Sequence, residues 1–515
     1  MREITKITFY GKDFSELTDA KYRLGDLDTL YQLDGSKPKE DAYADRLELL
    51  KKFCDSYAPD GKHEGICLRF PKNRDRFYKY VGVFRNKKFP FGGEEYDVTL
   101  EISCRFDQDK KAFFLAAMLL CLGSEELNRK LKNPELVNLS FHQVMDIFLL
   151  FMFKRQLAEA AKKGILRKYQ RFENNDSRPH GTIDIARHIR ENMGLKSGSI
   201  AYHYRELTAN NPVNRLILAA YRRLCEKYPM LCETRIKSEE SVYSTLKMLQ
   251  TELGYSKTNV RNIVKENLRP VTHPYFSEYE ALRKTCLRIL RDENVSIFDA
   301  DCDEETEPLC VDVTRLWEQF LEFRLDEALK KPEYSALTLT TQGREPDNKR
   351  GSTQGRQLFF ERYDNEPYDK RYNKYSKPDL ILWRKTQAQK KQTILDAKFK
   401  PDWDEFFSGT GKQNTTTIDG DINKCIRDMV VFQAERTGVI FPSENSTRDK
   451  KYHIGFYIGA RDASARGFDM VGVPVPPEGG KRFEAWYGEE LVKDVDRALA
   501  DYLDRVLKDE GSPPR

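Results

Sequence analysis

The sequence predicts an α+β chain of several domains: a β-rich N-terminal domain, a mainly helical middle region and a C-terminal α/β domain. The 515 residues are enough for two to four domains. Short alternating runs dominate residues 1–125, and a 3.6-residue apolar period dominates residues 126–300. Apolar strands and amphipathic helices share residues 301–515. We place the domain boundaries at these changes of pattern.

The N-terminal domain is predicted from runs such as "GICLRF", "YKYVGVF" and "YDVTLEISCRF". Apolar and polar residues alternate in these runs as they do in half-buried strands. The turn-rich segment "NKKFPFGG" joins the last two runs. One helix is expected over residues 42–57.

Helices are predicted along most of the middle region. One starts at Ser140, a residue type that caps helix N-termini, and ends at Gly164. The segments "NPVNRLILAAYRRLCEKY" and "EYEALRKTCLRILRDE" show the helical period with basic outer faces. The run "SIAYHYREL" is expected to form a short strand between helices.

The C-terminal domain begins with an amphipathic helix expected over residues 313–329. Two apolar strands follow, "DLILW" and "TILDAKF", and then a helix over residues 422–435. The strands "YHIGFYIG" and "DMVGVPV" and a last helix over residues 491–506 complete the chain. This mixture of strands and helices predicts an α/β unit.

Composition excludes several classes of protein. The net charge of +5 is small for this length, so any nucleic-acid-binding surface must be local. Ten cysteines without a CxxC pair and only seven histidines give a zinc site little support, and free thiols in a reducing compartment are expected. The longest apolar runs, near residues 112–123 and 144–153, are too short to span a bilayer, and no signal peptide is evident. We therefore expect a cytoplasmic protein.

One stretch, "YSKPDLILWRKTQAQKKQTILDAKFK" at residues 375–400, combines a Pro-Asp pair with an Asp-x-Lys triplet. The chain has three other Pro-Asp pairs, so the pair alone is a weak signal. Here Pro378 suits the entry of a strand because it cannot donate to a sheet ladder. Asp379 then opens an apolar run, and a hairpin would bring it beside Asp396. Because alternate residues face the same side of a strand, Asp396 and Lys398 share one face.

These three polar residues have the chemistry of a phosphodiesterase site. Two neighbouring carboxylates repel each other unless a cation lies between them. Ligation by oxygen alone suits Mg²⁺ or Mn²⁺, which can lower the pKa of a bound water and stabilise charge on a phosphoryl oxygen. A lysine beside them can orient or deprotonate the attacking water, or stabilise the developing negative charge. The alternative is that Asp379, Asp396 and Lys398 are the solvated ends of two ordinary strands.

The order helix, Pro-Asp strand, Asp-x-Lys strand, helix resembles the PD-(D/E)xK nuclease superfamily. This resemblance implies a restriction-endonuclease-like domain with a mixed central sheet over residues 301–515. The superfamily often takes a further acid from the preceding helix, where "RLWEQFLEF" offers Glu318 and Glu322 on one face. The resemblance also implies that Lys424, in the next helix, points to the scissile phosphate. Ordinary exposed helix charges are the alternative for these residues, and Asp421 is expected to cap the helix that carries Lys424.

A second resemblance covers residues 80–428. The segments "GILRKYQRFENNDSRPHGTIDIARHIREN" and "IAYHYRELTANNPVNRLILAAYRRL" are similar to the McrC family, the nuclease subunit of McrBC-type modification-dependent restriction systems. The family has a Gly-x-Ile-Asp segment, a strand ending in an acidic-Leu-Thr link and an Asn-Arg that opens a long helix; the matching residues are Gly181, Ile183, Asp184, Glu206, Leu207, Thr208, Asn214 and Arg215. Upstream, "YVGVFRNKKFPFGGEEYDVTLEISCRF" looks like the family's strand pair. "LWEQF" is similar to its Leu-Phe-Glu-x-Phe helix, which selects Glu318.

The chain departs from the McrC pattern at a few positions. His180 stands where an arginine is usual, and Lys424 and Asp428 stand where a glutamine and a tyrosine are more frequent. These departures leave the role of that helix open. Taken singly, Asn214 is expected to cap a helix, Gly181 to make a turn and Asp184 to be exposed. The matching residues of the middle region therefore identify the family and are not expected to be catalytic.

The McrC resemblance implies a reaction and a partner. It implies a metal-dependent DNA endonuclease subunit that acts with an McrB-like AAA+ hexamer hydrolysing GTP or ATP. Asp379, Asp396 and Glu318 would hold the metal, and Lys398 would position the water. The sequence has no GxxxxGK[ST] loop, so the motor is expected on another chain, with residues 1–125 as its contact region.

Two alternatives to this function stay open. One is a stand-alone PD-(D/E)xK nuclease of another defence or mobile-element system. The other is a non-catalytic adaptor that stimulates the motor.

Overall fold

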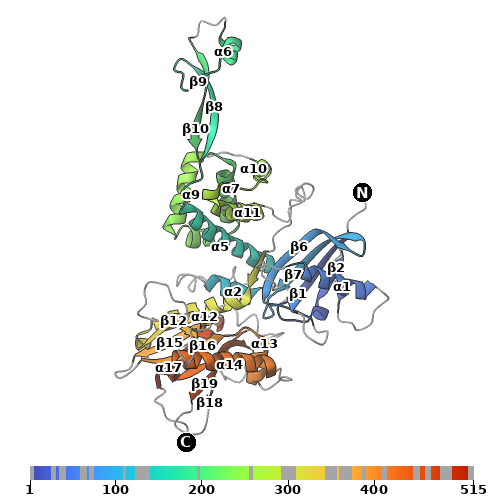
Figure 1. Ribbon diagram of the computed structural model, residues 1–515, viewed down its shortest axis with the longest axis vertical. Helices are drawn as coiled ribbons and strands as arrows, with labels where there is room; N and C mark the ends of the chain where they lie inside the picture. Colours follow the sequence, from blue (N-terminus) through green and yellow to red (C-terminus); the bar gives the residue numbers. More distant parts are fainter. Residues whose placement is uncertain are drawn as a thin grey trace, which may run out of the picture. The chain divides into compact units, whose positions relative to one another are not determined.

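The computed structural model describes most of the chain in two compact units. The described residues are 5–24, 31–33, 42–57, 67–68, 75–107, 112–121, 140–193, 198–254, 259–290, 309–342, 356–358, 374–385, 390–408, 415–444, 453–458, 466–475 and 490–508. One unit joins Met1–Val144 to Glu305–Arg515, and the other is Met145–Glu304 (Figure 1). The predicted mixture of helices and several sheets is confirmed, whereas the division into three domains stays a prediction. No helix among the described residues is both long and apolar enough to cross a membrane.

The first unit contains the predicted β-rich N-terminal part. Its six-stranded sheet has the order β11-β6-β7-β1-β2-β3, with β1 at Thr5–Lys12, β2 at Lys21–Leu24, β3 at Tyr31–Gln32, β6 at Tyr80–Phe91, β7 at Glu94–Ser103 and β11 at Leu309–Asp312. The strands β4 (Cys67–Leu68) and β5 (Arg76–Phe77) form a separate pair, and the helices are α1 (Ala42–Asp55) and α2 (Phe113–Cys121). The core forms where Leu49 and Phe53 of α1 join Phe9, Phe84 and Leu100 of the sheet. Strand β11 comes from the far side of the middle region and pairs with β6, so the sheet is completed by a distant segment.

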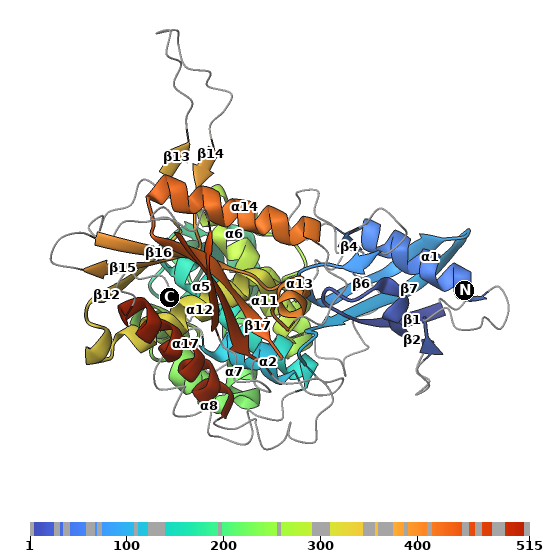
Figure 2. The ribbon, with the colours of Figure 1, turned by 90° about the horizontal axis from the view of Figure 1, so that it is seen from below.

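The second sheet of this unit is the mixed sheet of the C-terminal part. Its order is β12-β15-β16-β17-β19-β18, with β12 at Leu337–Thr341, β15 at Leu380–Lys385, β16 at Lys390–Ala397, β17 at Arg436–Ser443, β18 at His453–Ile458 and β19 at Arg466–Pro474. Strands β16, β17 and β19 run parallel, and the other neighbours are antiparallel. The helices are α12 (Val313–Leu329), α13 (Pro401–Ser408), α14 (Thr415–Phe432) and α17 (Glu490–Lys508), and β13 (Arg356–Leu358) pairs with β14 (Lys374–Ser376). Figure 2 shows α14 on one face of the sheet and α17 on the other.

Strand alternation decides which residues of the central hairpin face α14. Ile381, Trp383 and Ile394 form a buried cluster with Met429 and Phe432 of that helix. Leu380, Leu382 and Leu395 are also buried, as expected for a strand pair covered on both faces. The α14 face is therefore apolar in the middle of β15 and β16, and the polar residues at the strand ends lie on the same face.

The second unit is more than the helical region that the sequence predicts. Its helices are α5 (Phe141–Ala161), α6 (Ile185–Asn192), α7 (Pro212–Lys227), α8 (Pro229–Leu231), α9 (Glu240–Leu253), α10 (Val260–Glu266) and α11 (Glu278–Leu290). The expected strand is β10 (Ile200–Thr208), and it pairs with β8 (Lys168–Asp176) and β9 (Thr182–Ile183). Figure 1 shows β8 and β10 as a long hairpin that leaves the helices and carries α6 near its tip. Strand β8 is exposed along its length except at the partly buried Phe172.

The structure corrects two of the single-residue expectations for this unit. Asn211, not Asn214, caps α7: its side chain accepts the Asn214 N–H at 3.1 Å. Asn214 is fully buried and donates to the carbonyls of Leu166 and Ala209. Asp184 is half-buried and caps α6, so it is not simply exposed.

Gly181 makes the predicted turn. It has a φ of +96°, and a Cβ there would lie 2.7 Å from the His203 carbonyl oxygen. Because a larger residue would clash, this position requires glycine.

Candidate active site

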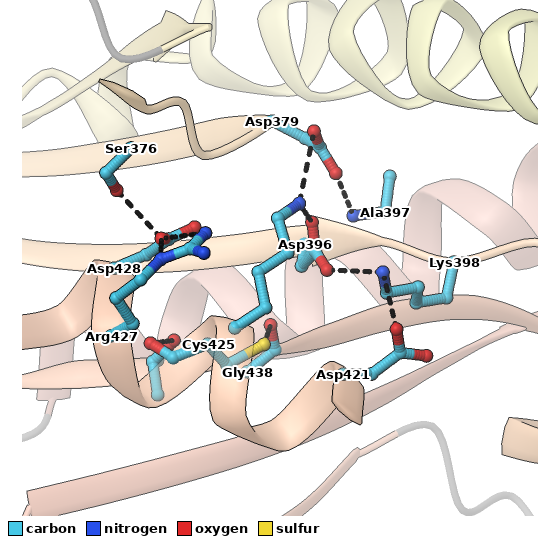
Figure 3. Close-up of polar contacts among 12 residues, drawn as sticks. Ser376, Asp379, Asp396, Ala397, Lys398, Asp421, Cys425, Arg427, Asp428 and Gly438 are labelled. Atoms are coloured by element: carbon cyan, nitrogen blue, oxygen red, sulfur yellow. Dashed lines mark hydrogen bonds and ion pairs between the residues drawn. The ribbon is translucent and has the colours of Figure 1, made fainter. Parts of the chain in front are cut away.

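The hairpin of β15 and β16 brings Asp379 beside Asp396, as the sequence predicts. Leu380 pairs with Leu395, which sets the preceding Asp379 opposite the following Asp396. The Asp379 carboxylate accepts the backbone N–H of Ala397 at 2.9 Å (Figure 3). Both carboxylates are thus fixed by the register of one strand pair at one end of the sheet.

Lys398 follows β16 and lies on the same side as Asp396, as alternation predicts. Its backbone N–H donates to the Ile440 carbonyl at 2.9 Å, which continues the parallel pairing of β16 with β17. Its Nζ lies 2.7 Å from Asp396 Oδ2. This ion pair joins a carboxylate that is 3% exposed to an ammonium side chain that is 13% exposed.

Lys424 reaches the same carboxylates from α14. Its Nζ donates to Asp396 Oδ1 and lies 3.9 Å from Asp379 Oδ1. The ammonium group therefore stands beside both carboxylates, where a cation offsets their repulsion. The expectation that Lys424 belongs to the site agrees with this placement, although its contact with phosphate stays a prediction.

The electrostatics of the site follow from burial and these neighbours. Burial, followed by the charge of Asp396, raises the pKa of Asp379 to about 9. Burial alone would raise the pKa of Asp396, but the hydrogen bond with Asp379 and the charges of Lys424 and Lys398 outweigh it and hold that pKa below its usual range. At neutral pH and without a metal ion, Asp379 is therefore protonated and Asp396 is ionised.

Both lysines are charged at neutral pH. Burial lowers the pKa of Lys398, but the carboxylates of Asp396 and Asp421 outweigh it and raise the pKa above its usual value. The pKa of Lys424 is raised in the same way by Asp396 and Asp379 against the effect of burial. Each side chain is therefore a hydrogen-bond donor in this state.

Glu318 lies close enough to Asp396 and Lys424 to interact with their charges. Burial raises the pKa of Glu318, Lys424 lowers it and Asp396 raises it further. Glu322 is exposed instead and accepts a hydrogen bond from Thr341 Oγ1 at 3.3 Å. Of the two helix acids, Glu318 is thus the one that interacts with the site.

The structure does not bring Glu318 into one tight cluster with the two aspartates. Across the described part of the chain, no group of three or more acidic, histidine or cysteine side chains is arranged to hold a metal ion. Asp379 and Asp396 still fit a divalent cation chemically. They offer only oxygen donors, and the Lys424 ammonium already lies against both carboxylates in the absence of a metal ion.

Asp421 does not cap its helix as expected. Helix α14 begins at Thr415, before the predicted start, so Asp421 lies inside the helix. Its carboxylate contacts Lys398 Nζ at 3.0 Å and accepts the Trp403 Nε1–H at 3.0 Å. The sequence indicated only that Asp421 lies one turn before Lys424 on the same helix face, which places it near the site without predicting its contacts with Lys398 and Trp403.

Comparison with known proteins identifies the family of this chain. A family model described as the McrBC 5-methylcytosine restriction system component matches residues 76–417. The chain belongs to this McrBC family. The match spans Glu318 and the hairpin with Asp379, Asp396 and Lys398, and it ends before Lys424.

Two solved McrBC structures are similar to this chain at low sequence identity. One is a refined half-complex from a tetradecameric assembly of Thermococcus gammatolerans McrB AAA+ hexamers with bound McrC, with 14% identity, a TM-score of 0.40, and coverage of 96% of this chain and 100% of that chain. The other is the cryo-EM structure of the Thermococcus gammatolerans McrBC complex, with 17% identity, a TM-score of 0.25, and coverage of 63% and 88% respectively. A search of curated proteins gave no match. Membership of the McrBC family therefore depends on the family model, and it confirms the resemblance seen in the sequence.

Proposed function

We propose that this McrBC-family chain is the DNA endonuclease subunit of a restriction system, with Mg²⁺ or Mn²⁺ as its cofactor. The observation that carries the proposal is the convergence of Asp379, Asp396 and Lys398 at the end of one hairpin, with Lys424 added from α14. A PD-(D/E)xK assignment of the mixed sheet that holds them is part of the proposal.

Asp379 and Asp396 are the proposed metal ligands, and Glu318 is the proposed third acid, which orients or completes the ligand set. A divalent ion held there would supply a water of lowered pKa and would stabilise charge on a phosphoryl oxygen. The proton on Asp379 would leave when the ion binds, because metal ligation requires a deprotonated carboxylate.

Lys398 is proposed to orient the attacking water and to stabilise the negative charge that develops on phosphorus-bound oxygen. Its raised pKa favours this donor role over deprotonation of the water. The water gives a proton to solvent as its oxygen forms a bond to phosphorus, one bridging P–O bond breaks, and the leaving oxygen takes up a proton from solvent. Lys424 is proposed to exchange its carboxylate contacts for a phosphate oxygen of DNA.

The partner in this proposal is a separate McrB-like AAA+ motor that hydrolyses GTP or ATP. The family to which the chain belongs is described as a component of a restriction system, and the sequence printed here has no GxxxxGK[ST] loop. Residues 1–125 are the proposed contact region.

The test is cleavage of 5-methylcytosine-containing and unmethylated plasmid DNA by the wild-type chain, with and without an McrB-like motor from the same genome. The proposal expects cleavage that requires Mg²⁺ or Mn²⁺, stops with EDTA and depends on the motor. Cleavage that needs no motor would instead indicate a stand-alone nuclease. Stimulation of the motor without any cleavage would indicate a non-catalytic adaptor.

A further inference from the structure

Two carboxylates from different elements hold the ammonium group of Lys398. Asp396 comes from its own strand and lies 2.7 Å away, and Asp421 comes from α14 and lies 3.0 Å away (Figure 3). Asp421 is only 7% exposed. A carboxylate so deeply buried requires partners, and Lys398 is the closest cationic partner that it has among the described residues.

The orientation of Asp421 is itself fixed by the core. Its Oδ2 atom accepts the indole N–H of Trp403 at 3.0 Å, and Trp403 is fully buried with Phe441 and Phe468. This leaves Oδ1 for Lys398, with Lys400 Nζ farther away at 3.5 Å. The carboxylate is thus aimed at Lys398 by a side chain that cannot move without disturbing the core.

The carboxylate of Asp421 becomes important once a divalent metal ion is bound to Asp396. A divalent ion on Asp396 would neutralise the charge that attracts Lys398 and would repel the ammonium group directly. Asp421 is not a proposed metal ligand, so its carboxylate stays available to Lys398. We propose that Asp421 is a positioning residue, which anchors the Lys398 ammonium in the site when the cation occupies Asp396. The assignment rests on the proposed function for the role of Lys398.

The same helix provides a matched control. Asp428 is also a buried aspartate of α14, and it accepts a hydrogen bond from Ser376 Oγ at 2.7 Å. Two turns of helix separate Asp421 from Asp428, so both lie on the same face. No contact joins Asp428 to Lys398 in the described structure. Asp428→Asn therefore measures how neutralising a buried aspartate of α14 affects the protein when the contacts of Lys398 are kept.

The test compares the wild-type chain, Asp421→Asn and Asp428→Asn, each with the motor and Mn²⁺. We expect Asp421→Asn to lower kcat by about 10- to 100-fold, the range found when outer partners of a metal site are removed. The KM for DNA and the Kd for Mn²⁺ should change by less than about threefold, because Asp421 is not among the proposed ligands. Asp428→Asn should keep the wild-type kcat.

A second readout does not depend on cleavage. In trace labelling with acetic anhydride, the rate at Lys398 in the Mn²⁺-loaded chain should rise at least about threefold in Asp421→Asn and stay unchanged in Asp428→Asn, because an unanchored amine is more accessible. Trp403→Phe keeps an aromatic ring in the core but removes the N–H donor together with part of the indole, so an intermediate effect on both readouts is expected. It serves as the test variant if Asp421→Asn fails to fold.

Two results would overturn the inference. Wild-type kcat and wild-type labelling in Asp421→Asn would make Asp421 a purely structural residue, while metal-dependent cleavage by the wild-type chain would leave the proposed function standing. A loss of kcat accompanied by an equal loss of Mn²⁺ affinity would place Asp421 in the metal site. If the wild-type chain does not cleave at all, the proposed function fails, and the labelling result alone decides whether Asp421 anchors Lys398.

Discussion

Arg105 joins the N-terminal sheet to the end of β16, and its contribution to the free energy of unfolding can be measured. Its side chain pairs with Asp13 at 3.2 Å and donates to the carbonyl oxygen of Phe399, the residue after Lys398. The guanidinium carbon lies 5.0, 4.4 and 4.6 Å from the ring centres of Phe14, Phe106 and Phe399. The side chain of Asp13 is 0% exposed and that of Arg105 is 14% exposed, so this is a buried ion pair.

The perturbation is Arg105→Met, which keeps a long side chain among the rings and removes the charge. Removing one partner of a buried ion pair costs about 3–5 kcal/mol, because the other charge is left without compensation. Loss of the cation–π contacts adds about 0.5–1 kcal/mol. Burial raises the pKa of Asp13 although Arg105 lowers it, so without Arg105 the carboxyl can take up a proton as the pH falls. The loss should therefore be about 3 kcal/mol or more at pH 8 and smaller at pH 5.

The assay is urea unfolding followed by tryptophan fluorescence. All four tryptophans lie in residues 305–515, within the unit that contains Arg105, so the signal reports that unit alone. Lys52→Met is the control, because Lys52 pairs with Glu48 at 3.1 Å on α1 of the same unit and the two side chains are 57% and 59% exposed. Exposed pairs contribute about 1 kcal/mol or less. An Arg105→Met chain that loses no more stability than the Lys52→Met chain would refute this prediction.

Three further predictions concern the candidate site. Asp379 holds a proton up to a pKa of about 9, and this proton must leave when Mn²⁺ binds. The Mn²⁺ affinity measured by calorimetry should therefore rise about tenfold per pH unit between pH 6 and 8, and Asp379→Asn should abolish this dependence. A flat profile in the wild-type chain would contradict the prediction. Lys424→Met removes an ammonium group that competes with the metal ion for Asp396. Mn²⁺ should therefore bind about tenfold more tightly, which is the effect of losing one charge-assisted hydrogen bond, while DNA cleavage slows. Weaker Mn²⁺ binding would show that Lys424 does not compete with the ion. Glu318→Gln should slow cleavage by about tenfold or more and Glu322→Gln should not, and equal rates in both variants would remove Glu318 from the site.

Local pattern was sufficient to predict the elements that carry the site. The apolar period placed α12 at Val313–Leu329, and alternation along β16 put Asp396 and Lys398 on one face. A short polar link between two apolar strands was enough to predict the hairpin that aligns Asp379 with Asp396. These are properties of neighbouring residues, which a single sequence contains.

Features that depend on distant segments were not predicted. Strand β8 lacks an apolar face and exists because β10 pairs with it over its whole length. Strand β17 was missed although it lies beside β16 in the sheet, and β11 was not expected to join the N-terminal sheet. Asp421 was misread as a cap because its partners, Lys398 and Trp403, come from other elements. Tertiary pairing, not local propensity, decides each of these features.

The most direct test of the central claim is the rate of Mg²⁺-dependent DNA cleavage, with the motor present, by Asp396→Ala and Lys398→Ala against the wild-type chain. Asp428→Asn, a buried aspartate outside the proposed ligand set, controls for folding. The account predicts that both site variants lose at least about a hundredfold in rate, the size of effect seen when one group that stabilises transition-state charge is removed, while Asp428→Asn keeps its activity. Cleavage by Asp396→Ala and Lys398→Ala at the wild-type rate would contradict the account.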